Sequence, residues 1–293
     1  MQTKPYGNSG FQVSILGLGA GQVGDERLAE PDAAHLLNTA LDLGITLIDT
    51  ARGYGLSEER IGRHLSHRRS EFVLSTKVGY GIPGHADWSG DIIEAGVDAA
   101  LARLRTDHID IVHLHSCELS TLQAGAVVDA LVRLREKGKI RVAAYSGENE
   151  ALAWALADGR FGGVECSVNL FDQGGLAGPL AGARRDGLGV IAKRPLGNAP
   201  WRFAQRPVGD YAETYWERMH ELAYDTSGMA WDEFALRFSA WQPEVSCAIV
   251  GTASVAHLKH NAAIVATGPL PDDVVAATRR RFAECGGAWS GQV

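Results

Sequence analysis

The chain alternates between short apolar runs and longer segments in which apolar and polar positions follow a helical period. The apolar runs are rich in β-branched residues and lack strict alternation, which is typical of parallel strands that are covered on both faces. They span residues 13–18, 45–50, 72–78, 109–115, 140–146, 163–169, 188–193 and 245–250. The pattern therefore predicts eight buried strands.

Amphipathic segments fill the intervals between these runs, with apolar residues recurring every three or four positions. Pro31 suits the first turn of the first helix, and Gly44 follows the end of that helix. We expect helices near residues 31–43, 57–65, 89–104, 121–136, 148–157, 177–186, 211–224, 231–240, 254–266 and 271–284.

Strands that alternate with helices in this way predict an α/β fold, a (β/α)8 TIM barrel. Residues 3–14 look like a small β-hairpin that closes the barrel floor. The interval between the last two strands is longer than the others and has room for a long loop and an additional helix. No linker or change in composition divides the chain, so we expect residues 1–293 to form a single domain.

Composition narrows the classes of function. Lys and Arg number 28 against 35 Asp and Glu, so the net charge is −7, and no basic block is present. Such a chain is a poor ligand for nucleic acid or an anionic membrane. No apolar stretch is long enough to span a membrane, no signal peptide is evident, and the four cysteines are widely spaced. We expect a cytoplasmic protein with free thiols that acts on a small molecule.

Residues 19–24 read Gly-Ala-Gly-Gln-Val-Gly, which matches the G-x-G-x-x-G fingerprint of dinucleotide-binding folds. That fingerprint requires a helix that opens on the glycines. Here the polar segment 25–31 follows, and Pro31 marks a later helix start. We therefore interpret the glycines as a flexible first loop at the barrel mouth.

Polar residues stand at the carboxyl ends of successive predicted strands, where barrel enzymes place their active sites. Asp49, Lys77 and His115 end three of these strands, and Tyr54 follows Asp49 by five positions. A buried lysine requires a charge partner, and Asp49 lies one strand away from Lys77. We expect these side chains to meet at one face of the barrel.

This set of residue types suits proton transfer to an oxygen atom. The pKa of tyrosine is ordinarily about 10. A neighbouring ammonium favours the phenolate, so we expect Lys77 to lower the pKa of Tyr54. His115 can orient or polarise a carbonyl oxygen. No side chain can deliver a hydride, so the set implies a nicotinamide cofactor.

The sequence resembles the aldo-keto reductase family over nearly its whole length. The resemblance rests on LGLGA near the start, IDTARGYGLSEERIG at 48–62, LSTKVG at 74–79, IDIVHLHS at 109–116, IRVAAYSG at 140–147 and CAIVGTASVAHLKHN at 247–261. It implies NAD(P)H-dependent interconversion of aldehydes or ketones and alcohols. It also implies a catalytic tetrad of Asp49, Tyr54, Lys77 and His115, with Tyr54 as the proton donor.

The resemblance further implies a cofactor site along the later strand ends. Its residues are Ser146, Glu165, Lys193, Pro195, Leu196, Gly197, Gly251, Thr252, Ser254, His257 and Asn261. Ser146 matches the family's contact to the carboxamide, whereas Gly147 and Glu165 replace the usual Asn and Gln. Lys193 replaces a stacking aromatic residue. A cation there would discourage the oxidised nicotinamide or, in the interpretation that we favour, would pair with Glu165.

The adenosine end of the site also departs from the family. Gly251 and His257 stand where many members have Lys and Arg beside the 2′-phosphate, although the helix near residue 254 still offers its N-terminal amides. We expect NADP(H) to be preferred over NAD(H). We expect the loops that follow the strands to form the substrate pocket, which would be lined by Tyr80, Trp88, Cys117 and Trp201. The tail after residue 284 is short, so we expect the pocket to lack a long C-terminal wall.

Two other interpretations remain open. His113 and His115 lie on one strand face and, with Asp49, could hold a catalytic metal in a barrel hydrolase, but Lys77 beside the ion argues against a resident metal. Alternatively, the altered nicotinamide contacts fit a regulatory or redox-sensing barrel that binds cofactor with little turnover. The sequence indicates neither the substrate, the direction of the reaction nor the oligomeric state.

Overall fold

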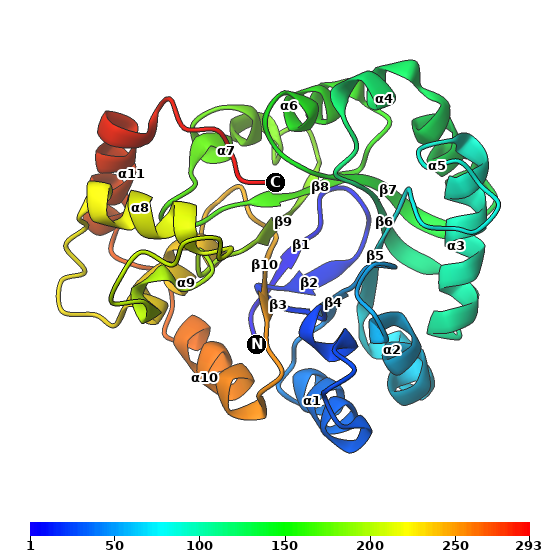
Figure 1. Ribbon diagram of the computed structural model, residues 1–293, viewed down its shortest axis with the longest axis horizontal. Helices are drawn as coiled ribbons and strands as arrows, with labels where there is room; N and C mark the ends of the chain where they lie inside the picture. The colour runs from blue at the N-terminus through cyan, green and yellow to red at the C-terminus, as the bar shows by residue number, and fades with distance from the viewer.

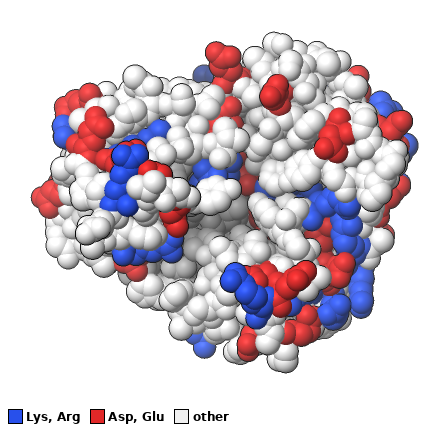
Figure 2. Space-filling view, viewed as in Figure 1, with Lys and Arg blue, Asp and Glu red and all other residues white.

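A computed structural model describes residues 1–293 as a closed barrel of parallel strands surrounded by helices (Figure 1). Each strand pairs with its neighbour in chain order, and the last strand pairs with the first to close the barrel. Viewed from the same side, the molecular surface is hollowed over the centre of the barrel (Figure 2). The strands are β3 (Leu16–Gly19), β4 (Leu47–Asp49), β5 (Val73–Val78), β6 (Ile109–His115), β7 (Ile140–Ser146), β8 (Gly163–Ser167), β9 (Gly189–Lys193) and β10 (Cys247–Gly251). The prediction of a (β/α)8 barrel is confirmed.

The helices lie on the outside of the barrel (Figure 1). Two of them, α8 and α9, fill the long interval between β9 and β10, where the sequence predicted helices near 211–224 and 231–240. None of the helices is both long and apolar enough to cross a membrane. They are α1 (Glu30–Asp42), α2 (Ser57–Leu65), α3 (Gly90–Leu104), α4 (Leu119–Ala124), α5 (Ala126–Glu136), α6 (Asn149–Asp158), α7 (Gly174–Ala177), α8 (Glu213–Leu222), α9 (Trp231–Ala240), α10 (Val255–Ala266) and α11 (Asp272–Gly286).

Two predicted helices and one predicted strand differ from the structure. The segment 121–136 is split into α4 and α5 because Gly125 takes a φ of 84° between them. The segment 177–186 is not a continuous helix, since Gly178 breaks it into α7 and a 3-10 turn at Pro179–Gly182. The first apolar run is shared between two strands, because Val13 belongs to the N-terminal hairpin and only Leu16–Gly19 enters the barrel.

The hairpin closes the barrel floor, as the sequence predicted. Its strands β1 (Thr3–Pro5) and β2 (Gln12–Ser14) pair antiparallel. The ring of Tyr6 is fully buried among side chains from the barrel interior. A Cβ at Gly163 or Gly189 would lie 2.1 or 2.5 Å from this ring's atoms, so the plug depends on glycine in both neighbouring strands.

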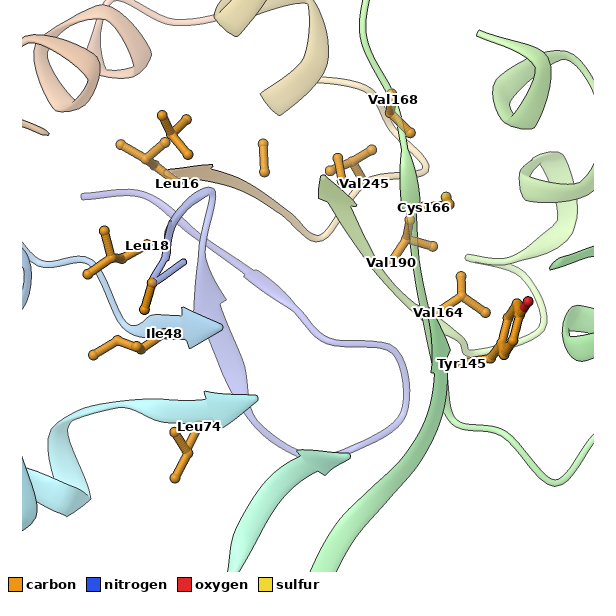
Figure 3. Close-up of a cluster of buried hydrophobic side chains, with 14 of the residues drawn as sticks. Leu16, Leu18, Ile48, Leu74, Tyr145, Val164, Cys166, Val168, Val190 and Val245 are labelled. Carbon is orange, nitrogen blue, oxygen red and sulfur yellow. The ribbon is translucent and has the colours of Figure 1, made fainter. Parts of the chain in front are cut away.

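The alternation of side chains along each strand separates the main core from the site. Leu16, Leu18, Ile48 and Leu74 project outward from their strands toward the helices, where they join the large apolar core (Figure 3). Because successive residues of a strand point to opposite faces, the residue that follows Ile48 points into the barrel. The outer core thus fixes the register that places Asp49 inside.

Candidate active site

A cavity of about 770 Å³ opens at the carboxyl ends of the strands, at the hollow seen in Figure 2. It brings together nine of the residues that the sequence predicted for the site: Asp49, Tyr54, His115, Ser146, Glu165, Lys193, Pro195, Leu196 and Gly251. A second cavity of about 830 Å³ lies beside α10, but its lining is mostly apolar and Lys259 is its only charged side chain. The first cavity is therefore the candidate site.

Lys77 lies just beneath this cavity, at the end of β5, and is almost completely buried. Its ammonium contacts Oδ2 of Asp49, lies 3.3 Å from Oε2 of Glu165 and donates to the carbonyl of Thr50 at 3.0 Å. Oδ1 of Asp49 accepts a hydrogen bond of 2.8 Å from the Ser75 hydroxyl. The expected Asp49–Lys77 pair is thus present, with a second carboxylate beside it.

The buried pair sets the protonation of its neighbours. Burial opposes the charge of Lys77, but the two carboxylates outweigh burial and hold its pKa above the ordinary value. Burial, and then the Glu165 charge, raises the pKa of Asp49 to about 7. Burial also raises the pKa of Tyr54 to about 12, against the opposing effect of Lys77. Lys77 does lower the pKa of Tyr54, as expected, but burial of the phenol outweighs this effect and the two carboxylates add to the net rise.

Tyr54 is held over Lys77 by the glycine segment at 19–24. The Lys77 ammonium lies 5.3 Å from the centre of the Tyr54 ring. A Cβ at Gly24 would lie 1.6 Å from the Tyr54 carbonyl oxygen, so only glycine permits this approach. The segment ends in a 3-10 turn rather than a helix and lies at the barrel mouth. It is therefore not a Rossmann fingerprint, and its last glycine packs tightly against the Tyr54 loop.

His115 ends β6 and is oriented by Tyr80. The Tyr80 hydroxyl lies 2.9 Å from Nδ1 of His115, and the two ring centres are 5.5 Å apart. Burial, and then Lys77, lowers the pKa of His115 to about 4, so the ring is neutral at pH 7. A hydroxyl that donates to Nδ1 leaves the ring proton on Nε2. Tyr80, which the sequence predicted for the substrate pocket, thus lies against the histidine and does not line the cavity.

The other three residues predicted for the substrate pocket also lie outside the cavity lining. Trp88 packs on Tyr80 with ring centres 5.8 Å apart. Cys117 is buried, and its carbonyl accepts a hydrogen bond of 3.0 Å from the Tyr145 hydroxyl. Trp201 stacks on Trp231 at 6.0 Å. Each of them packs against other aromatic or buried groups at the barrel rim.

The metal-binding arrangement considered above does not form. Ligand atoms of Asp49, His113 and Glu165 lie within 4.8 Å of one another. However, the Lys77 ammonium already contacts Asp49 and lies 3.3 Å from Glu165. His115 is not part of the group, because it faces Tyr80. A cationic side chain therefore holds the place that a hydrolase would give to its metal.

The departure at Gly147, directly after β7, has a steric cause. Ser146 and Glu165 face each other across the cavity floor, with the Ser146 hydroxyl 3.5 Å from Oε1 of Glu165. A Cβ at Gly147 would lie 2.2 Å from the Tyr145 hydroxyl oxygen, so this position has no room for the asparagine that the family usually has there. Ser146 and Glu165 are left as the polar pair at this point of the wall.

Comparison with known proteins shows a match to the aldo/keto reductase family over residues 15–280. The chain belongs to this family. It is 28% identical to the L-galactose dehydrogenase of Arabidopsis thaliana over 282 residues, which cover 90% of this chain and 88% of that protein. It is 27% identical to the D-threo-aldose 1-dehydrogenase of a Pseudomonas species, covering 87% of this chain and 90% of that protein.

The fold is likewise that of the family. The holo form of an aldo-keto reductase from Bacillus halodurans superposes with a TM-score of 0.81, covering 98% of this chain and 97% of that chain at 23% identity. This protein is therefore an oxidoreductase of a family that uses NAD(P)H.

Lys193 of this aldo/keto reductase does not pair with Glu165. Its ammonium lies 3.2 Å from Oε1 of Glu148, which also accepts a hydrogen bond of 2.7 Å from the Ser167 amide. Glu165 is instead 3.3 Å from Lys77. The predicted ion pair between Lys193 and Glu165 is therefore wrong, because Glu148, directly before α6, lies against Lys193 instead.

The remaining residues predicted for the cofactor lie outside the cavity lining. Ser254 caps α10 by accepting from the amide of His257 at 3.3 Å, and Thr252 accepts from the Ser254 amide at 3.0 Å. His257 is exposed, Asn261 is buried, and Gly197 takes a φ of 53° in the loop after β9. They lie in the segments that follow β9 and β10, and their binding roles stay predictions.

Several residues that sequence reasoning missed line the same cavity: Gln22, Ser116, Arg194, Arg202, Tyr211 and Val293. Arg194 donates to the carbonyls of Gln292 and Val293 at 3.0 Å, so the short tail reaches the mouth and forms part of the wall. The tail is short, as the sequence indicated, and only its last residue lines the cavity. Two arginines in one loop of an acidic chain were a visible signal, whereas nothing in the sequence indicated where the tail would lie.

Proposed function

We propose that this aldo/keto reductase interconverts an alcohol and a carbonyl group of a small substrate with NADP(H), using Tyr54 as the proton donor. The observation that carries the proposal is that one cavity is bordered by Tyr54, His115 and Asp49, with the buried Lys77 ammonium beneath them. A phenol, a neutral imidazole and an ammonium around one point suit the protonation of an oxygen. The fitting acceptor is the oxygen of a substrate carbonyl.

The residues present fit a dinucleotide. The cavity has a volume of about 770 Å³, which is within the range of small-molecule sites. Arg194 and Arg202 line it in a chain whose net charge is −7, so these two guanidinium groups favour a phosphorylated ligand. Ser146 and Glu165 would face the carboxamide, and Pro195 and Leu196 the pyrophosphate side. The bound nicotinamide supplies the hydride that no side chain can carry.

The protein's own groups then manage the proton. Tyr54 is protonated at neutral pH, since its pKa is about 12, and its hydroxyl donates to the substrate oxygen. Lys77 stabilises the phenolate that remains, because an adjacent ammonium favours the charged form. His115, with its proton on Nε2, donates a second hydrogen bond that orients the same oxygen. Asp49 holds Lys77 in place and touches no substrate.

We infer an aldose as the substrate class. The support is the pair of relatives named L-galactose dehydrogenase and D-threo-aldose 1-dehydrogenase, both matched over most of this chain. The preference for NADP(H) over NAD(H) rests on the N-terminus of α10, where Ser254 and the exposed His257 stand beside free backbone amides. The cytoplasmic location stays a prediction.

Replacement of Tyr54 by phenylalanine tests the proposal. We expect kcat with an aldose panel to fall by about a thousandfold, because the proton donor is lost. NADPH affinity, measured by calorimetry, should stay within about twofold. Tyr145→Phe is the matched control, since this buried tyrosine bonds only to the Cys117 carbonyl and lies outside the cavity lining. Equal turnover in Tyr54→Phe and the wild type would remove Tyr54 from the mechanism.

A further inference from the structure

Two carboxylates share one ammonium at the floor of the catalytic cavity. Asp49 and Glu165 are both 2% exposed, and both have Lys77 as their nearest cation. Asp49 also accepts a hydrogen bond from the Ser75 hydroxyl, but Oε2 of Glu165 has no hydrogen-bond donor. A buried charged oxygen without a donor is costly, and such groups in a cleft mark functional positions.

No other cation balances the second carboxylate. Lys193 is the next ammonium in the wall, and Glu148 neutralises it at 3.2 Å. His113 lies 3.8 Å from Glu165, but burial lowers its pKa to about 4, so the ring is neutral at pH 7. His115 is neutral for the same reason. With both carboxylates ionised, the floor of the cavity therefore carries an excess negative charge.

This excess charge faces the place where the proposed function puts the nicotinamide. Glu165, Ser146 and Lys193 border the same cavity as Tyr54 and His115. The oxidised nicotinamide ring carries a positive charge, whereas the reduced ring is neutral. In a partly desolvated cavity, one nearby unpaired charge shifts the ratio of the two affinities by about tenfold or more.

We propose that Glu165 makes the cavity select the oxidised over the reduced nicotinamide, and so makes the bound oxidised cofactor a weaker hydride acceptor. The inference rests on the proposed function. In the oxidation of an alcohol, the alcohol carbon would give a hydride to the ring and the alcohol oxygen would give its proton to the Tyr54 phenolate. Glu165 takes no part in either transfer, and it acts through its charge on the form of cofactor that binds.

The test compares dissociation constants of NADP⁺ and NADPH for the wild type and for Glu165→Gln, by calorimetry at pH 8. At this pH both carboxylates are ionised, since the higher pKa of the two is about 7. We expect NADP⁺ binding to weaken by about tenfold in Glu165→Gln, while NADPH binding stays within about twofold. Glutamine has nearly the same shape, so a role in packing alone would leave the ratio unchanged.

Two further variants separate charge from shape and from distance. Glu165→Asp keeps the charge, so it should retain most of the wild-type ratio. Asp110→Asn removes a buried carboxylate near the opposite end of the same barrel, where Arg69 holds it at 2.7 Å, and should leave the ratio unchanged. An unchanged ratio in Glu165→Gln, or an equal change in Asp110→Asn, overturns the inference.

The outcomes also distinguish the inference from the function on which it rests. If the wild type binds neither NADP⁺ nor NADPH, the proposed function fails. If both bind and the ratio does not depend on Glu165, only the inference fails. Should Glu165→Gln not fold, the ratio of NADP⁺ affinity to NADPH affinity is measured for the wild type at pH 8 and again at pH 6. This ratio should fall at pH 6, because the Asp49–Glu165 pair takes up a proton, and a constant ratio would refute the charge effect.

Discussion

The two ends of the barrel bury charge in opposite ways. Near the amino end, the buried Asp110 carboxylate accepts hydrogen bonds from Arg69 at 2.7 Å and from the Leu74 amide at 2.8 Å. The Arg141 guanidinium lies 3.3 Å from the same carboxylate. Lys4 donates to three backbone carbonyls at 2.8 to 3.1 Å. At the carboxyl end, two carboxylates compete for one lysine.

The difference separates structure from function. Charges at the amino end also border a cavity, since Arg69, Asp110 and Arg141 line one of about 630 Å³, but there the carboxylate is matched by two guanidinium groups and an amide. At the carboxyl end, Oε2 of Glu165 lacks a hydrogen-bond donor, and this residue borders a cavity of about 770 Å³. An incompletely matched buried charge costs stability, so its place beside a cavity indicates a ligand that completes the match.

The largest expected effect comes from removing the shared ammonium. Lys77→Met leaves two buried carboxylates without a cation, so we expect the free energy of unfolding to fall by about 3–5 kcal/mol at pH 8. Urea denaturation measures it. Lys4→Met, the matched change at the amino end, leaves only neutral carbonyls and should cost about 1–3 kcal/mol.

A second substitution sharpens this contrast. Adding Glu165→Gln to Lys77→Met removes one of the stranded charges, so the double variant should be more stable than Lys77→Met alone. If Lys4→Met costs as much as Lys77→Met, or if the double variant is the less stable, the two ends do not differ as described.

A smaller effect should appear in the dependence of stability on pH. His113 lies fully buried below the cavity with a pKa of about 4 in the folded state, below its ordinary value of 6.5. Below pH 6.5 the unfolded chain therefore binds a proton that the folded protein refuses, and stability is lost as the pH falls toward 4. Between pH 7.5 and 5, the wild type should lose about 2 kcal/mol more than His113→Gln in urea denaturation.

Asp49 changes stability with pH in the opposite direction, but it is present in both the wild type and His113→Gln. The difference between these two proteins therefore isolates the contribution of His113. The pKa of Asp49 is raised to about 7 in the folded state, so the folded protein binds that proton more readily and gains relative stability as the pH falls through this range. Parallel pH profiles for the wild type and His113→Gln would show that His113 does not titrate as proposed.

The smallest effect belongs to the plug. The Tyr6 hydroxyl is fully buried at the amino end and has no hydrogen-bond partner. Tyr6→Phe removes a polar group that gains nothing from the fold, so the free energy of unfolding should change by less than about 0.5 kcal/mol or rise. Thermal denaturation is a sufficient measurement. A loss above about 1 kcal/mol would show that the hydroxyl has a partner in solution.

The barrel and the positions of the tetrad were predictable from the sequence. Apolar runs separated by amphipathic helices define parallel strands, and in a barrel all their carboxyl ends meet at one face. Asp49, Lys77 and His115 therefore had to converge, whatever the details of packing. The prediction of two continuous helices was wrong for a local reason, since Gly125 and Gly178 interrupt segments whose apolar period continues through them.

Only the tertiary structure decided how the side chains at that face pair and what they protonate. Lys193 lies against Glu148 rather than Glu165, and Tyr80 lies against His115 rather than in the cavity wall. The raised pKa of Tyr54 follows from burial and two carboxylates, which outweigh the opposite effect of the neighbouring lysine. The physical reason is range: periodicity is a property of nearby residues, whereas ion pairing and desolvation depend on ångström-scale distances between residues far apart in the chain.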